Sequence, residues 1–285
     1  MSSKKQNLTC HPSKKNNGFS CYSLDQLKKI AGTLNKRGKN IPTNTNNRIE
    51  LWKNINNVMK DSCSEEWCWI NQGILSNVND DELRQKTFKP IHPDEWLDNK
   101  YAWLSNFDID AVMEQYEDIY KDFLFLGPVP IDFEDIYTEL SGKTLQNLYK
   151  QGKRRIGIVF NLDPHWKGGS HWVCMYIDMN DINNGMIAFY DSYGMEPGNE
   201  IQDLMSKFVS QGLSDEPNIV LEPIYNPVQH QHKNSECGMY CINLINSMLK
   251  TNGTREDFIN ECKDIINDEK MNSFRKFYFL DNGKK

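Results

Sequence analysis

The chain has 285 residues, of which 38% are hydrophobic and 25% charged, and its formal net charge is −6. This length and composition fit a soluble globular protein with one sizeable core and an appendage. No apolar run approaches the length of a membrane span and the first residues lack the apolar segment of a signal peptide, so we expect neither a membrane protein nor a secreted one.

The first sixty residues are strongly basic. They hold twelve Lys or Arg side chains against only Asp25 and Glu50, a balance of +10, so the rest of the chain carries −16. Such a segment could hold the protein on nucleic acid or on an acidic assembly surface. The alternatives are a solvated helical face, or a Lys-rich and Asn-rich composition that reflects an AT-rich genome.

Two helices are predicted inside this basic segment. Ser23 is a suitable N-cap for a helix over 23–31, and a second helix over 49–59 follows a polar break from Asn35 to Asn47. This order of a helix, an extended link and a second helix resembles a SAP-type module, which in other proteins often binds DNA.

The cysteines of the N-terminal part were considered as metal ligands. They lack both C-x-x-C and a regular pair spacing, so we predict no metal site, although zinc remains an alternative. Eight cysteines without a secretory signal predict reduced thiols rather than a disulfide framework. The candidate zinc ligands are Cys10, His11, Cys21, Cys63 and Cys68.

The next elements lead into the acidic part of the chain. A packed helix is predicted over 67–75, and Pro90 and Pro93 lie in a polar linker. We therefore predict a helical arm domain over 1–95 and a second domain over 96–285. An amphipathic helix is predicted over 108–125, ended by Gly127-Pro128-Val129-Pro130, and a short helix follows over 133–140.

Strands dominate the middle of the second domain. Apolar runs predict strands over 156–160, 172–177 and 186–190, then a helix over 201–208 and a strand over 219–221. The turn at Asn183-Asn184-Gly185 joins two of the strands into a hairpin, which brings His171 and Asp191 to the same end. A small mixed sheet with helices outside gives an α+β domain.

Cys237 lies where a polar loop meets an apolar helix. A thiol is nucleophilic as the thiolate, and the first turn of a helix favours an anion. Acyl transfer by a thiolate also needs a base, a group that orients the base, and a donor for the oxyanion. A His-carboxylate pair such as His171 with Asp191 would supply the first two.

Four elements in this order resemble the Ulp1/SENP and adenain clan of cysteine proteases: His171-Trp172, Asp191-Ser192, Gln231, and Cys237-Gly238 six residues later. Within that clan the likeness is greatest to the polyprotein-processing protease of African swine fever virus and related proteases of large DNA viruses. It covers roughly Trp103 to Leu280. Further matching stretches are 104–110, 160–163, 235–238 and 267–275.

The resemblance implies a papain-related core of a small mixed sheet flanked by helices, and it assigns four roles. His171 would be the general base and Asp191 the residue that orients it. Gln231 would donate its side-chain amide to the oxyanion, and Cys237 would be the nucleophile.

The resemblance also implies a narrow substrate tunnel. Trp172 and Trp103 match the tryptophans that close such a tunnel over small substrate residues, and Asn161 is assigned to substrate binding with them. One position departs from the swine fever enzyme, which resembles papain in having Asn where this chain has Asp191. With Asp191 beside His171, the formation of an imidazolium–thiolate pair should therefore depend less on the cysteine alone.

Each of these residues also has an ordinary structural interpretation. His171 could be a packed core histidine, Asp191 a turn former and Trp103 a core side chain. Gln231 could be a solvated loop amide, and Gln229 could hold its role instead. The other cysteines of this part are interpreted as inert core thiols: Cys174, Cys241 and Cys262.

We therefore predict a cysteine endopeptidase without cofactor or metal that cleaves Gly-Gly-X junctions. The resemblance implies viral structural or core polyproteins as substrates, with the protein in the virion or in the viral factory of the host cytoplasm. The alternatives are a SENP-like isopeptidase acting on SUMO or ubiquitin-like conjugates, an acetyltransferase of the same clan, and an inactive scaffold.

Overall fold

The computed structural model describes residues 9–14, 19–63, 65–70, 80–136, 144–214 and 216–281. Its contacts divide the chain into two units, Met1–His92 with Lys276–Lys285, and Pro93–Arg275. The predicted division lay near residue 95 and assigned the whole C-terminal part to the second domain. Two separately folding domains remain a prediction.

The first unit contains both helices predicted in the basic segment. α2 (Leu24–Lys36) begins with a capping box, because the Ser23 hydroxyl accepts from the Gln26 N–H and the Gln26 side chain accepts from the Ser23 N–H. α3 (Arg48–Met59) begins at Asn47, whose side chain accepts from two first-turn N–H groups. The apolar faces of α2 and α3 share a core that includes Leu27, Ile30, Leu34, Leu51, Ile55, Trp69 and Phe88.

Three shorter helices lie in the described part of residues 1–92. They are η1 (Pro12–Lys14), α4 (Glu66–Trp69) and α5 (Asp80–Gln85). The helix predicted over 67–75 is described only as far as Ile70, one residue beyond α4, and Ile74 and Leu75 lie outside the described residues.

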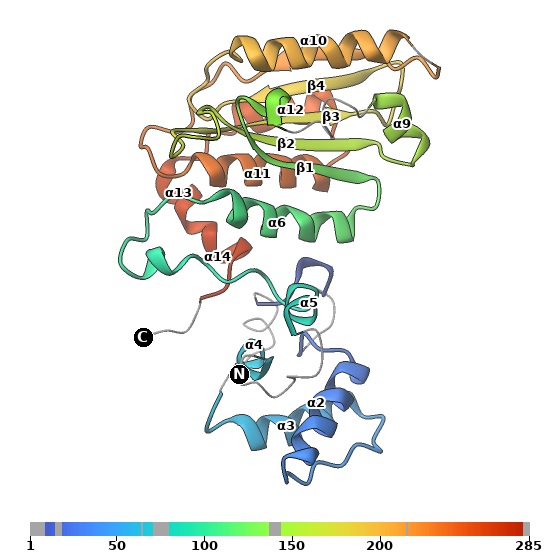
Figure 1. The fold of residues 1–285 in the computed structure, drawn as a ribbon, viewed down its shortest axis with the longest axis vertical. Coiled ribbons are helices and arrows are strands. Elements are labelled where there is room, and N and C mark those ends of the chain that lie inside the picture. Colours follow the sequence, from blue (N-terminus) through green and yellow to red (C-terminus); the bar gives the residue numbers. More distant parts are fainter. Residues whose placement is uncertain are drawn as a thin grey trace. The chain divides into compact units, whose positions relative to one another are not determined.

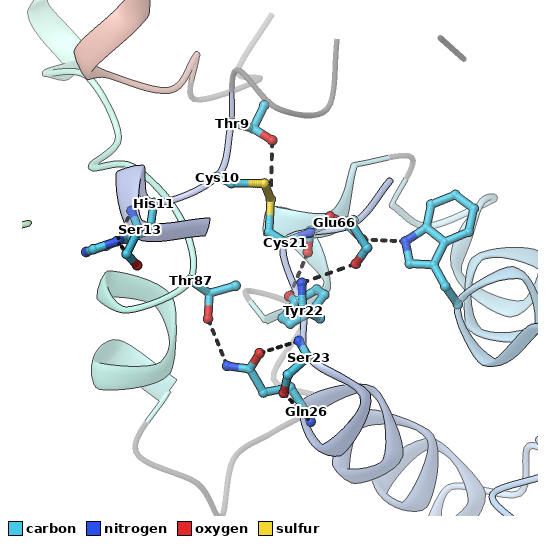
Figure 2. The surroundings of a disulfide bond; sticks show 12 residues. Thr9, Cys10, His11, Ser13, Cys21, Tyr22, Ser23, Gln26, Glu66 and Thr87 are labelled. Carbon is cyan, nitrogen blue, oxygen red and sulfur yellow. Dashed lines mark hydrogen bonds between the residues drawn. A yellow bond between two sulfur atoms is a disulfide. The ribbon is translucent and has the colours of Figure 1, made fainter. Parts of the chain in front are cut away.

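The prediction of reduced thiols is wrong for the first unit. Cys10 is joined to Cys21, and Cys63 to Cys68, with Cα atoms 5.2 Å and 5.8 Å apart. Folding brings these pairs within disulfide range, a closeness in space that the prediction of reduced thiols did not take into account. Figure 2 shows the first pair beside Glu66, whose carboxylate accepts from the Cys21 N–H at 2.9 Å.

The second unit is built on a five-stranded mixed sheet (Figure 1). The three central strands are antiparallel, while β1 runs parallel to β2 and β5 parallel to β4. This confirms the predicted α+β core and the predicted hairpin. The strands are β1 (Phe123–Pro130), β2 (Arg155–Asn161), β3 (Trp172–Asp178), β4 (Gly185–Tyr190) and β5 (Leu221–Tyr225).

Helices cover both faces of this sheet, which is why β3 and β4 are buried along their whole length. α9 (Leu145–Lys150) and α10 (Asn199–Ser214) lie on one face, and α6 (Asn106–Ile119) and α11 (Cys237–Lys250) lie on the other (Figure 1). The remaining elements are η3 (Asp94–Leu97), α7 (Phe133–Ile136), α12 (Arg255–Lys263), α13 (Asp268–Ser273) and α14 (Arg275–Tyr278).

The helix predicted over 108–125 is wrong beyond Ile119. The chain turns there, and Phe123–Pro130 forms the edge strand β1 instead. An edge strand tolerates proline, and the register shifts next to Gly127, whose φ is +83°. The apolar residues of this segment have a spacing that fits either a helix or a strand, so the sequence pattern could not distinguish the two. Pairing with β2 makes the segment a strand.

Two smaller predictions shift as well. β5 begins at Leu221, at the end of the predicted range 219–221. α7 ends at Ile136, and Tyr137 and Leu140 of the predicted helix lie outside the described residues. Within the described part of the chain, none of the helices has the length and apolar character that crossing a membrane requires.

Candidate active site

Cys237 is the first residue of α11, where the sequence predicted a helix to begin. The N-cap residue, Glu236, makes no side-chain hydrogen bond to the helix, so the first-turn N–H groups keep their partial positive charge for an anion. A Cβ at Gly238 would lie 3.3 Å from the side chains of Leu104 and Trp172. Glycine therefore lets both side chains approach the start of the helix.

His171 and Asp191 meet at one end of the hairpin. His171 precedes β3 and Asp191 follows β4, and the pairing of Cys174 with Tyr190 brings these two ends together. His171 Nε2 lies 2.7 Å from Asp191 Oδ1, and both side chains are largely buried. An ordinary packed histidine needs no carboxylate partner, so that interpretation of His171 does not account for the contact with Asp191.

Two residues that the sequence analysis missed hold this pair in place. The Tyr193 ring stacks on the His171 imidazole, with centroids 4.7 Å apart and planes at 28°, and the Tyr193 N–H donates to Asp191 Oδ1 at 2.8 Å. Asn226 Nδ2 donates to the Asp191 carbonyl at 3.0 Å. The sequence indicates only a turn for the segment that contains Tyr193. No motif or residue spacing in the sequence points to Asn226.

The surroundings of His171 favour its charged form. Burial acts to lower the pKa of His171, but hydrogen bonds to Asp191 and to Cys237 and the charges of both raise it from 6.5 to about 9. Because Nε2 faces Asp191, the nitrogen left for Cys237 is Nδ1. An imidazolium that keeps its proton at neutral pH stabilises a thiolate beside it. Such surroundings suit a cysteine nucleophile.

Gln231 is fully buried, so the interpretation as a solvated loop amide is wrong. Its Oε1 accepts from the Ser192 hydroxyl at 2.7 Å, and its Nε2 donates to the Lys233 carbonyl at 2.6 Å. The other contact of Nε2 is a long one, 3.5 Å to the Tyr193 hydroxyl. Gln229 is exposed and donates to the backbone carbonyl of Gln231. Of these two glutamine side chains, the buried one is therefore that of Gln231.

The three predicted substrate-binding residues, Trp103, Trp172 and Asn161, line one pocket of about 500 Å³. Trp172 Nε1 donates to the Leu104 carbonyl at 3.1 Å, which fixes the segment that follows Trp103. Trp103 itself is 41% exposed, which excludes its interpretation as a core side chain. Leu104 and Trp172, which line this pocket, also lie beside Gly238, the residue after Cys237.

Asn161 shapes the loop that borders this pocket. Its Oδ1 accepts from the N–H groups of Asp163 and Ser170 at 3.0 and 3.2 Å. Gly169 has φ +88°, and a side chain there would collide with Asn161 Nδ2. The amide therefore acts on loop geometry as well as lining the pocket.

The remaining cysteines of the second unit are free and buried. Burial raises the pKa of Cys241 well above its usual value and that of Cys262 to about 12. Both stay protonated at neutral pH and fit the interpretation as core thiols. Among the described residues, no group of three or more His, Cys, Asp or Glu side chains could hold a metal ion.

Comparison with known proteins finds a family model and relatives that match parts of the chain. Residues 156–284 match the model of the Ulp1 protease family, C-terminal catalytic domain. The chain is 29% identical over 286 residues to R355 of Acanthamoeba polyphaga mimivirus, named for a thiol protease, covering 93% of this chain and 90% of R355. It is 27% identical over 194 residues to the cysteine protease S273R of African swine fever virus, covering 64% of this chain and 69% of S273R.

The fold agrees with a solved structure over almost the whole chain. The crystal structure of the pS273R protease of African swine fever virus superposes with a TM-score of 0.72 at 21% identity, covering 96% of each chain. At that identity the likeness concerns the fold.

Proposed function

We propose that this chain is a cysteine endopeptidase that cuts polypeptides at Gly-Gly-X junctions, since residues 156–284 match the model of the Ulp1 protease family, C-terminal catalytic domain. One observation carries the proposal: His171 Nε2 lies 2.7 Å from Asp191 Oδ1, and Asp191 and Cys237, the first residue of α11, together raise the pKa of His171.

The proposed reaction begins with the proton of Cys237 on His171. The thiolate attacks the scissile carbonyl, and the oxygen that becomes negative accepts from the Cys237 N–H and from Gln231 Nε2. Nε2 is suited to this role because one of its two hydrogens has only the long contact to Tyr193. The imidazolium then gives its proton to the departing amine. Water, deprotonated by His171, releases the acyl group from the sulfur.

The preference for glycine follows from the shape of the pocket. Trp172 and Leu104 pack directly on Gly238, the neighbour of the nucleophile, and Trp103 lines the same pocket. A substrate that crosses this place has little room for side chains next to the scissile bond, and glycine has none. The proposed substrates are viral structural or core polyproteins cut during particle maturation, in the virion or the viral factory.

The test compares two peptides, protein conjugates and acetyl-CoA as substrates. Quenched peptides with a central Gly-Gly-Ala or Ala-Ala-Ala are incubated with the wild-type protein and with Cys237→Ala. We expect cleavage of the glycine peptide by the wild type alone, at the bond after the second glycine. Conjugates of SUMO or ubiquitin form a second arm, and cleavage of conjugates without cleavage of the peptide would establish the isopeptidase instead. Acetyl transfer from acetyl-CoA without any hydrolysis would establish the acetyltransferase, and no turnover in any arm the inactive scaffold.

Contact between nucleic acid and residues 1–60 is a separate proposal that rests on charge. Lys29, Lys36, Arg37, Lys53 and Lys60 are among its exposed cations. Electrostatic binding of this kind weakens steeply with salt. Retention of the full chain on DNA at about 50 mM salt and loss at about 200 mM would support it, and no retention at the lower salt would contradict it.

A further inference from the structure

The carboxylate of Glu236, immediately before Cys237, is buried and does not cap the helix that Cys237 begins. It turns instead toward Arg275, which is also buried. Arg275 Nε donates to one carboxylate oxygen and Nη2 to the other, each at 2.9 Å. Asn272 Nδ2 and the Ser235 hydroxyl donate to the second oxygen at 2.9 and 3.1 Å. The residue that precedes the nucleophile is therefore held by a two-pronged ion pair.

The same guanidinium reaches the segment that leads into the substrate pocket. Arg275 Nη1 donates to the carbonyls of Lys100 and Ala102 at 3.1 and 2.8 Å. The guanidinium carbon lies 4.1 Å from the centre of the Trp96 ring, and Trp96 Nε1 also donates to the Ala102 carbonyl. One side chain thus ties the backbone before Trp103 to the residue before Cys237.

This tie completes a frame around the pocket. Trp172 holds the segment after Trp103 through the Leu104 carbonyl, and Arg275 holds the segment before it. Ala102, whose carbonyl accepts from Arg275, is separated by Trp103 alone from Leu104, whose carbonyl accepts from Trp172. A shift of the guanidinium would therefore move the Trp103 wall and the start of α11 together.

We propose that Arg275 is a positioning residue of this protease, which through Glu236 and the carbonyls of Lys100 and Ala102 sets the distance between the nucleophile and the Trp103 wall. Arg275 also offsets the negative charge of Glu236 beside the thiolate. The role for substrate rests on the proposed function; the effect on the sulfur does not.

Arginine is required here for its shape as well as its charge. Its planar fork satisfies both carboxylate oxygens and leaves Nη1 for the two carbonyls, which the single ammonium of lysine cannot do. Burial lowers the pKa of Arg275, while the negative charges of Glu236 and Cys237 act against that shift.

The experiment measures the reactivity of the sulfur and the hydrolysis rate separately. Alkylation of Cys237 by iodoacetamide, followed by mass spectrometry across pH, reports the thiolate without any substrate. Hydrolysis of the Gly-Gly peptide gives kcat and KM. In Arg275→Gln the unpaired Glu236 carboxylate should raise the alkylation midpoint by about one pH unit. Misplacement should lower kcat/KM by about 100-fold.

Two conservative variants separate charge from geometry. Arg275→Lys keeps the charge, so the alkylation midpoint should stay near that of the wild type while kcat/KM falls by about tenfold or more. Glu236→Gln removes the carboxylate, so the midpoint should not rise, and kcat/KM should again fall. If either Arg275→Gln or Arg275→Lys fails to fold, Glu236→Met with Arg275→Met replaces the pair by apolar side chains, an exchange that buried ion pairs often tolerate. That double variant should fold and still lose kcat/KM by about 100-fold.

Arg155→Lys is the matched control. Arg155 is similarly buried, forms the same two-pronged pair with Asp122 at 2.7 Å and donates to the Leu249 carbonyl at 3.1 Å. It begins β2, whereas Asn161 of the pocket ends it, about 20 Å away at 3.3 Å per residue. This variant should lose stability but keep the alkylation midpoint and kcat/KM within about twofold, as expected for distant sites.

Wild-type kcat/KM in folded Arg275→Lys and Glu236→Gln would overturn the proposal. So would an alkylation midpoint that moves as far in Arg155→Lys as in Arg275→Gln, because the shift would then reflect general loosening. If the wild-type protein cuts no Gly-Gly peptide, the proposed function fails, while the alkylation profiles still decide the effect of Arg275 on the sulfur.

Discussion

Replacement of Asp191 by Asn tests how much of the His171 charge depends on its carboxylate. The substitution keeps the size of a buried side chain and an oxygen that can accept from His171 Nε2 and from the Tyr193 N–H, at 2.7 and 2.8 Å in the wild type. It removes only the negative charge. Among the factors that raise the pKa of His171 to about 9, the hydrogen bond to Asp191 is the largest.

The structure sets the magnitude and the pH range. The folded-state pKa of His171 lies above the unfolded value of 6.5, so its contribution to stability is complete below pH 6.5 and is lost as the pH rises through about 9. At about 1.4 kcal/mol per pKa unit, that contribution is about 3 kcal/mol for the coupled His171, Asp191 and Cys237. A loss of about one unit on neutralising Asp191 should remove about 1.4 kcal/mol of it.

Two measurements check this prediction. The decline of kcat/KM at high pH should begin about one unit lower in Asp191→Asn than in the wild type. Denaturant unfolding at pH 6 and pH 9.5 should show a smaller difference in free energy for the variant. Asp178→Asn, at the other end of β3, is the control and should leave the high-pH decline in place. An unchanged decline in Asp191→Asn would refute the assignment of the His171 charge to its carboxylate.

Three further predictions concern the nucleophile, the oxyanion and a buried acid. Cys237→Ala should abolish peptide hydrolysis with little change in melting temperature, whereas Cys241→Ala should retain hydrolysis; equal rates in wild type and Cys237→Ala would remove the sulfur from the mechanism. Gln231→Ala should lower kcat by about 100-fold or more, as for loss of one oxyanion donor, and if Gln229→Ala does so instead, the donor has been misassigned. Burial raises the pKa of Asp178 to about 6, so stability present below its unfolded value of 3.8 is lost as pH rises through 6. Asp178→Asn should abolish this loss of about 3 kcal/mol, and urea unfolding at pH 4 and pH 7 that shows the same loss in the variant would exclude Asp178 as its source.

The candidate site could be predicted from sequence because each of its parts is local. A helix start places Cys237, and a hairpin turn of six residues brings His171 beside Asp191. The capping signal at Ser23 likewise predicted where α2 begins. Such features depend on neighbouring residues and survive without knowledge of the rest of the fold.

The sequence failed where several structures satisfy the same local pattern. The apolar residues from Asp108 to Phe125 fit a continuous helix, and only parallel pairing with β2 makes Phe123–Pro130 a strand. The disulfides of the first unit were missed because neither the spacing of Cys10 and Cys21 nor that of Cys63 and Cys68 predicts a distance in space.

By itself, then, the sequence indicated the candidate catalytic residues of this protein: a cysteine at a helix start, a histidine and an acid on one hairpin, and a family pattern that orders them. Tertiary structure alone decided what surrounds that chemistry. Arg275 lies 38 residues beyond the nucleophile and its carbonyl partners lie at Lys100 and Ala102. The energy of such a contact depends on distance in space, which a linear pattern of residues does not contain.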